Sequence, residues 1–537
     1  MAIQKSTPRL ILILLTAVFF SGMSWAAMVP LWQTPDEQAH FAQAQDLAAV
    51  GFRPNPGAST SQDIVISEKL LGTFRDELGN NKFTYHPEYR LPYANSTIGF
   101  NEKEIINLPV AMRKVFLINE ATGYPPLYYL YISAINKQFW SLDLISRVFL
   151  SRVATVLLSI GLGIAVFEIG KILFKQILFA YVLAAMTVFQ PMRMFAGSGV
   201  TSDALMNLIY PLSILLLLKA DLRPTWKNLI VLILSLIALL LTKTQGVFLI
   251  FISVFFWLKM IIDQKNRVGP KLISAVVLLA IAAVVSIGII NRTAFRNIIP
   301  QWLLANMFIP EVEDSGSLSS QPFLIDYIKT SAVDLYRQVL PWYWGVYRWL
   351  SLTLPLWVYR VIKIIIMASL IGLIAGFKKI KIVANLKPFA WLIGSSLVYA
   401  LGIYAWNLLF WRSKGFSFGI QGRYFFPNLP EHMAILLVGL LVLAPLRFRR
   451  AIGFATVTLM VLFNWFSLWF LSQSYYGSII NYQTFFLRAS QYKPWFFKTP
   501  LLEAWLGLGI FTSLWFLLSL MRYTRTQDHE NTRTQEH

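Results

Sequence analysis

The segment Pro35-Asp36-Glu37-Gln38-Ala39-His40 carries residue types well suited to chemistry. Pro35 fits the first turn of a helix, whose positively polarised amino-terminal end favours the carboxylates of Asp36 and Glu37. Asp36 and His40 are four residues apart and would share one helix face. A carboxylate there can accept a proton from an incoming hydroxyl group as a general base. The alternative is a simple helix cap, and two potential ligands, Asp36 and His40, do not make a metal site.

Aromatic segments elsewhere offer surfaces for a substrate. Tyr124 and Tyr128 belong to Tyr-Pro-Pro-Leu-Tyr-Tyr, a motif that favours an interfacial helix with tyrosines at the level of the lipid headgroups. An aromatic belt alone would give the same pattern. Arg348 belongs to the aromatic stretch 342–349, which is either a belt or a wall on which a sugar stacks.

Charged residues between apolar segments form a third group. Arg193 and Asp203 flank one such connection, where Asp203 either caps a helix or contributes to a site. Lys243 lies on the side opposite to most basic residues, so it either snorkels to the interface or binds a phosphate. Arg423, in the Gly-Arg-Tyr motif that ends at Tyr424, offers a planar guanidinium to a phosphate oxygen.

These residues are set in a strongly apolar chain of 537 residues, of which 56% are hydrophobic and 14% charged. An ordinary soluble domain has about 25% charged residues. The composition therefore predicts an all-α polytopic membrane protein. Cysteine is absent, which excludes disulfides, thiolate metal sites and cysteine nucleophiles. The chain also lacks a Walker A motif, a Rossmann glycine fingerprint, HExxH and GxSxG.

About twelve apolar segments approach the ~20 residues that a membrane-spanning helix needs. They cover residues 10–32, 146–171, 177–198, 203–219, 227–243, 245–260, 272–290, 357–377, 388–409, 425–446, 451–472 and 501–521. Lys and Arg cluster in every second connection, so the positive-inside rule predicts that both termini are cytoplasmic. The net charge of +21, from 47 basic and 26 acidic residues, is thus largely a topology signal and does not indicate a nucleic-acid partner.

The expected organisation is one integral-membrane domain over residues 1–521, in which the first apolar segment serves as a signal anchor. Residues 33–145 and 291–356 would be large extracytoplasmic loops. Residues 522–537 would form a polar, disordered cytoplasmic tail. Large outer loops and short inner connections indicate that chemistry or binding occurs on the extracytoplasmic face.

The order and common placement of these motifs resemble the GT-C superfamily of polytopic membrane glycosyltransferases. The chain is most similar to the bacterial membrane family named domain of unknown function 2142. The resembling segments are 35–41, 124–129, 202–205 and 422–425. The resemblance implies a GT-C-like fold with interfacial helices in its first outer loop. It also implies a sugar donor carried on a polyprenyl phosphate.

Residue roles follow from the same resemblance. It implies that Asp36 is the general base, with Glu37 as a helper or second candidate, and that Arg423 and Lys243 bind the lipid phosphate. Further substrate-binding residues would be His40, Tyr124, Tyr128, Arg193, Asp203, Arg348 and Tyr424. Lipid phosphate is a good leaving group, so no cofactor is required. A carboxylate pair could hold a divalent cation, but nothing in the sequence implies one.

We expect a glycosyltransferase of the bacterial inner membrane that moves a hexose or pentose to a cell-envelope glycan or lipid-linked acceptor at the periplasmic face. Its partners would be the polyprenyl-phosphate donor, the glycan or glycolipid acceptor and the bilayer. One alternative is a glycolipid flippase or transporter, whose essential charges near the bilayer midplane would be Glu431 and His432. Another is an envelope-polymer polymerase or ligase that uses the loop 291–356 to hold glycan chains.

Overall fold

The computed structural model describes residues 2–51, 60–76, 79–117, 124–263, 268–290, 322–415, 417 and 419–535. Within these ranges the chain is mostly helical, because apolar runs in a membrane must satisfy their backbone hydrogen bonds internally. The part of the second outer loop that covers 291–321 lies outside the described residues.

Nine stretches of the described chain are long and apolar enough to cross a membrane. They are Arg9–Met28, Leu144–Leu173, Ser202–Leu222, Thr244–Ile262, Leu356–Ala375, Leu386–Arg412, Gly422–Leu443, Leu446–Tyr476 and Leu501–Thr526. The helices in them are α1 (Ala2–Met28), α6 (Leu144–Leu173), α9 (Ser202–Leu222), α11 (Val247–Ile262), α17 (Leu356–Ala375), α19 (Leu386–Lys414), α20 (Leu429–Leu443), α21 (Arg449–Tyr476) and α23 (Leu501–Gln535).

Each of the twelve predicted apolar segments is largely helical in the structure. The count of twelve membrane spans stays a prediction. The segment 177–198 is a pair, α7 (Ile177–Val188) and α8 (Pro191–Gly197), bent by 58°. Pro191 cannot donate a backbone hydrogen bond, so the helix breaks there. The apolar parts of α10 (Trp226–Leu240) and α12 (Val268–Ile290) are shorter than a full span.

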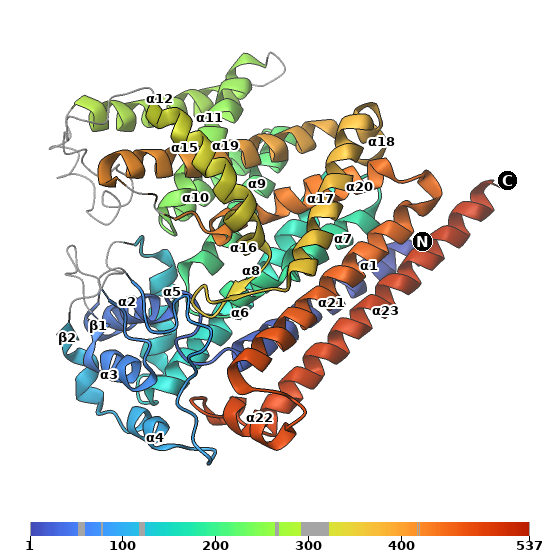
Figure 1. Cartoon of the computed structure of the whole chain (residues 1–537). Coiled ribbons are helices and arrows are strands. Elements are labelled where there is room, and N and C mark those ends of the chain that lie inside the picture. Colours follow the sequence, from blue (N-terminus) through green and yellow to red (C-terminus); the bar gives the residue numbers. More distant parts are fainter. Residues whose placement is uncertain are drawn as a thin grey trace.

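Residues 522–535 of the polar tail are helical, where the sequence predicted disorder. Helix α23 continues to Gln535. No Gly or Pro interrupts residues 522–535, so the helix that begins in the apolar segment continues into the polar one. Figure 1 shows α23 running beside α1, with both chain ends at the same end of the bundle.

The described parts of the segment 33–145, which the sequence predicts to be the first outer loop, form a helical layer at the other end of the bundle (Figure 1). Its elements are α2 (Glu37–Val50), α3 (Gln62–Leu71), α4 (Phe100–Ile106), the 3-10 turn η1 (Val110–Lys114), α5 (Leu127–Gln138) and the antiparallel strands β1 (Thr60–Ser61) and β2 (Phe116–Leu117). Helix α5 packs on α2 and α6. The loop therefore rests directly on the membrane-spanning part.

Shorter elements lie in the connections between the long helices. The second outer loop contributes α15 (Pro322–Asp334), a π-helical turn η3 (Leu335–Val339), α16 (Leu340–Trp344) and a hairpin of β3 (Val346–Tyr347) and β4 (Leu352–Thr353). The remaining elements are α18 (Ile380–Val383), α22 (Tyr482–Ala489), and the 3-10 turns η2 (Thr244–Gly246), η4 (Phe377–Lys379), η5 (Gly422–Asn428), η6 (Leu446–Phe448) and η7 (Trp495–Phe497).

A buried ion pair joins the end of α1 to α2 and α6. Arg152 of α6 donates from Nε to Glu37 Oε1 at 2.7 Å and from Nη2 to Oε2 at 2.5 Å, and both side chains are fully buried. Arg152 also donates to the carbonyls of Ala26, Val29 and Pro30. The carboxylate accepts further bonds from the backbone amides of Trp32 and Val200. With most of its donors and acceptors satisfied, this pair holds the turn between α1 and α2 in place.

Candidate functional site

Asp36 occupies a strained position directly before α2. Its backbone is left-handed, with φ 56° and ψ 17°, and its side chain does not cap the helix. A non-glycine residue in this conformation costs about 1–3 kcal/mol and persists only where the surroundings enforce it. The turn directs the Asp36 carboxylate into a cavity, while the neighbouring Glu37 carboxylate is turned into the protein.

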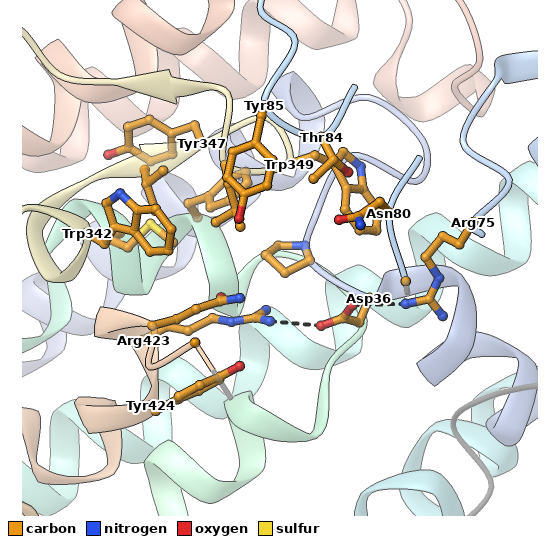
Figure 2. A pocket seen from close by; sticks show the side chains of 18 of the residues that line it. Asp36, Arg75, Asn80, Thr84, Tyr85, Trp342, Tyr347, Trp349, Arg423 and Tyr424 are labelled. Atoms are coloured by element: carbon orange, nitrogen blue, oxygen red, sulfur yellow. Dashed lines mark hydrogen bonds and ion pairs between the residues drawn. The ribbon is translucent and has the colours of Figure 1, made fainter. Parts of the chain in front are cut away.

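Two arginines hold the Asp36 carboxylate from opposite sides (Figure 2). Arg75 Nη1 lies 3.0 Å from Oδ1, and Arg423 Nη2 lies 2.8 Å from Oδ2. Both guanidinium side chains are 9% exposed, and the aspartate is 38% exposed. Burial alone would raise the pKa of the Asp36 carboxyl, but Arg423 and Arg75 outweigh it and hold the pKa well below its usual range.

The cavity beside this triad has a volume of about 400 Å³. Its charged side consists of Asp36, Arg75 and Arg423. Facing it is a largely aromatic wall, which Figure 2 shows above the carboxylate. The aromatic lining residues are Tyr85, Tyr124, Phe195, Trp342, Tyr347, Trp349 and Tyr424. The combination suits a ligand with both a negatively charged group and an apolar ring face.

Strained backbone is concentrated around this cavity. Besides Asp36, the lining residues Tyr85, Trp349 and Leu350 have positive φ values of 63°, 52° and 63°. The turn between β3 and β4 is anchored, since Trp349 Nε1 donates to the Trp32 carbonyl at 3.1 Å. Such strain is typical of sites where side chains must be held in a set orientation.

His40 and Tyr124 also line the cavity. The His40 ring hydrogen-bonds through Nδ1 with the hydroxyl of Tyr129 at 2.7 Å and packs against the Tyr124 ring. Burial lowers the pKa of His40 to about 4, in spite of the nearby Asp36 and Asp203 carboxylates. The ring is therefore neutral at pH 7.

Asp203 and Lys243 form an ion pair with each other next to this site. Asp203 lies at the start of α9, and Lys243 directly precedes η2. The Asp203 carboxylate also acts electrostatically on Arg423 and His40. Neither member of the pair lines the cavity, so Lys243 neutralises a carboxylate beside the site.

Four residues expected in the site lie elsewhere. Glu37 is fully buried against Arg152. The Tyr128 hydroxyl accepts a bond from the backbone amide of Thr201. Arg193 donates to Ser159 Oγ at 2.6 Å inside the helix bundle, and Arg348 donates to the carbonyls of Pro87, Tyr89 and Ser474. None of these four side chains lines the cavity, and their contacts are structural.

Arg75 and Arg152 were not predicted from the sequence. Arg75 lies in the first outer loop, 39 residues from Asp36, and nothing in its local sequence marks it. Arg152 carries a usable signal, because an arginine inside an apolar segment requires a buried partner. Glu37 is that partner.

A second, largely apolar cavity of about 350 Å³ lies on the other side of the same segments. Trp342 and Tyr424 line the cavity beside Asp36, which we call the charged cavity. Their neighbours in the sequence, Tyr343 and Phe425, line the apolar cavity. A small cavity of about 30 Å³ shares Gln338 with the first and Val339 with the second. The small cavity therefore borders both larger ones.

Glu431 and His432 lie beside this apolar region in α20. His432 Nδ1 is 3.1 Å from the hydroxyl of Tyr343. Glu431 is fully buried, and neither carboxyl oxygen has a hydrogen-bond partner among the described residues. In the described ranges no group of three or more His, Asp or Glu side chains is placed to hold a metal ion.

Comparison with known proteins identifies the family. A family model described as "Predicted membrane protein (DUF2142)" matches residues 19–432, which is more than half of the chain and includes both Asp36 and Arg423. No curated protein matches. The crystal structure of ArnT from Cupriavidus metallidurans bound to undecaprenyl phosphate is similar at 11% identity. That match covers 96% of this chain and 76% of that one with a TM-score of 0.36, a likeness too distant to support an inference on its own. The chain belongs to the DUF2142 family of membrane proteins, as its motifs led us to expect.

Proposed function

We propose that this protein is a GT-C-type glycosyltransferase that takes a sugar from a polyprenyl phosphate and transfers it to a glycan or lipid-linked acceptor on the extracytoplasmic face of the bacterial inner membrane. The observation that carries the proposal is the Asp36 carboxylate, held between Arg75 and Arg423 in a cavity with an aromatic wall. It combines a potential base, two cations for a phosphate and ring faces for a sugar.

The two larger cavities, which neighbouring residues of the same segments line, suit a donor with a charged head and an apolar chain. The sugar and phosphate would occupy the charged cavity, with the C–H face of the sugar against Trp342 and Trp349. The polyprenyl chain would leave past Tyr343 and Phe425 into the apolar cavity. A volume of about 400 Å³ is in the usual range for a small-molecule site.

The proposed reaction needs one base and positive charge at the leaving group. The acceptor hydroxyl oxygen forms a bond to the anomeric carbon of the sugar. The bond between that carbon and the phosphate oxygen breaks, and its electron pair stays on the phosphate. The acceptor proton passes to Asp36, while Arg75 and Arg423 stabilise the charge that grows on the phosphate. We assign the phosphate to these two arginines in place of Lys243, which is paired with Asp203.

The test is sugar transfer in proteoliposomes. Purified protein would be offered a panel of polyprenyl-phosphate hexoses and pentoses with envelope glycan acceptors, and release of free polyprenyl phosphate would be followed. We expect wild type and Glu88→Gln to release it, since Glu88 is an exposed carboxylate of the same outer loop. Asp36→Asn should lose about 10²–10⁴-fold in rate.

The transporter alternative makes the opposite prediction for Glu431. A transferase should tolerate Glu431→Gln, because this carboxyl has no polar partner to lose among the described residues. Movement of labelled lipid across the bilayer without any release of polyprenyl phosphate, abolished by Glu431→Gln and unaffected by Asp36→Asn, would contradict the proposal.

A further inference from the structure

The site that would bind a phosphate is occupied by the protein's own carboxylate. Both oxygens of Asp36 are engaged, one by Arg75 and one by Arg423 (Figure 2). A lipid phosphate in the charged cavity would need the same guanidinium groups. The carboxylate and the phosphate would carry like charges within one small space, so both cannot hold the two arginines equally well.

A second observation points to an acceptor from outside the protein. Arg423 Nε is buried and has no hydrogen-bond partner in the described part of the chain. A buried donor without an acceptor destabilises the protein, so such groups require an explanation. A phosphate has more acceptor oxygens than the Asp36 carboxylate and could satisfy Arg423 more fully.

We propose that the donor phosphate displaces Asp36 from Arg75 and Arg423, and that this exchange of anions creates the catalytic base. The inference rests on the proposed function and adds the regulation of its site. In the resting protein the arginines hold the carboxylate as a weak base. Once the phosphate binds the two guanidinium groups, the Asp36 carboxylate no longer pairs with Arg75 and Arg423 and has an anion beside it. Both changes strengthen it as a base, and they occur only when a donor is present.

The exchange also explains how product would leave. The donor is a phosphodiester with one negative charge, whereas the released polyprenyl phosphate is a monoester with up to two, so the arginines hold the product more tightly. Asp36 is protonated and neutral directly after transfer. When it loses that proton to water, its carboxylate again competes for Arg75 and Arg423 and favours product release.

Binding of farnesyl phosphate to the purified full-length protein tests the exchange without any sugar transfer. Asp36→Asn keeps the size of the side chain but removes the competing charge. Asp36→Gly removes the side chain, and both replacements tolerate the left-handed backbone at this position. Calorimetric titration in detergent would compare these variants with wild type, with Arg423→Gln and with Glu88→Gln as the matched control.

We expect Asp36→Asn and Asp36→Gly to bind farnesyl phosphate at least about tenfold more tightly than wild type, a difference of about 1.4 kcal/mol. Arg423→Gln should bind it at least about tenfold more weakly, and Glu88→Gln should be unchanged. Farnesol, which has no phosphate, should bind all variants alike. Equal or weaker binding of farnesyl phosphate by both Asp36 variants would overturn the exchange, as would an equal gain for farnesol.

These outcomes separate the exchange from the enzyme proposal. Tighter binding by the Asp36 variants, together with no sugar transfer by wild type, would retain the exchange and reject the transferase. Transfer that depends on Asp36, without tighter binding in Asp36→Asn and Asp36→Gly, would retain the transferase and reject the exchange.

Discussion

His40 links the stability of the folded protein to mild acid, because burial lowers the pKa of its ring. Its folded pKa of about 4 lies below the 6.5 of an unperturbed histidine, a gap that corresponds to about 3 kcal/mol. The unfolded chain therefore takes up a proton as the pH falls through 6.5, while the folded protein resists protonation until about pH 4. Stability from the neutral ring is present above pH 6.5 and is lost over this window.

We expect the melting temperature of the detergent-purified protein to fall between pH 7 and pH 4, and His40→Gln to fall less over the same range. The Asp36 ion pairs should persist through this window, because the pKa of that carboxyl is held well below its usual range. If the melting temperatures of wild type and His40→Gln fall equally between pH 7 and pH 4, groups other than His40 control the loss of stability in acid.

The different roles of Asp36 and Glu37 could not be predicted from the sequence. Two adjacent carboxylates have the same local chemistry, and the motif alone could not separate their roles. The left-handed turn at Asp36 separates them, because it directs one carboxylate to the cavity and the other to Arg152. Arg423 could be selected as a cation from its motif. Its contact with Asp36 spans 387 positions and required the fold.

The buried ion pair between Glu37 and Arg152 holds helix α2 against helix α6. Glu37→Gln leaves the Arg152 charge fully buried without its carboxylate, and breaking a buried pair in this way costs about 3–5 kcal/mol. We expect a large drop in melting temperature, measured as the fraction of protein that stays monodisperse after heating in detergent. Glu88→Gln should leave the melting temperature unchanged.

Asp36→Asn should lose less stability than Glu37→Gln, since its carboxylate is partly exposed and asparagine tolerates the left-handed backbone. A drop for Asp36→Asn as large as that for Glu37→Gln would contradict the assignment of different roles to these neighbours.

The apolar helices were the elements most accessible to prediction, because a span is a local property of about 20 residues. The bend at Pro191 and the helical tail were less accessible. A proline can kink or break a helix, but its presence does not fix the 58° angle between α7 and α8. The helical tail depends on the helix that precedes it. The aromatic stretch 342–349 could be identified as a candidate wall, but its placement over Asp36 depends on the strained hairpin turn.

For the whole molecule, contacts between distant connections agree with the alternation predicted from charge. Asp221 forms ion pairs with Lys259 and Lys387, all in connections expected on the cytoplasmic side. At the opposite end, Trp349 contacts Trp32, and Arg423 contacts Asp36. Which end faces the cytoplasm remains a prediction of the positive-inside rule.

The absence of cysteine makes this orientation simple to test with single substitutions. In spheroplasts, an impermeant maleimide should label Glu88→Cys and Ile480→Cys, because both positions are exposed at the cavity end. Lys378→Cys, in the connection between α17 and α19, should be labelled only after permeabilisation. The reverse pattern would place the cavity in the cytoplasm and would exclude an extracytoplasmic transfer.

The role of Asp36 as the base is tested by the turnover number of Asp36→Asn at saturating polyprenyl-phosphate sugar, measured together with its affinity for the same donor. If Asp36 accepts the acceptor proton, kcat should fall about 10²–10⁴-fold while donor binding is retained or becomes tighter. A normal kcat with weakened donor binding would contradict the account, because Asp36 would then serve to bind the donor and not to activate the acceptor.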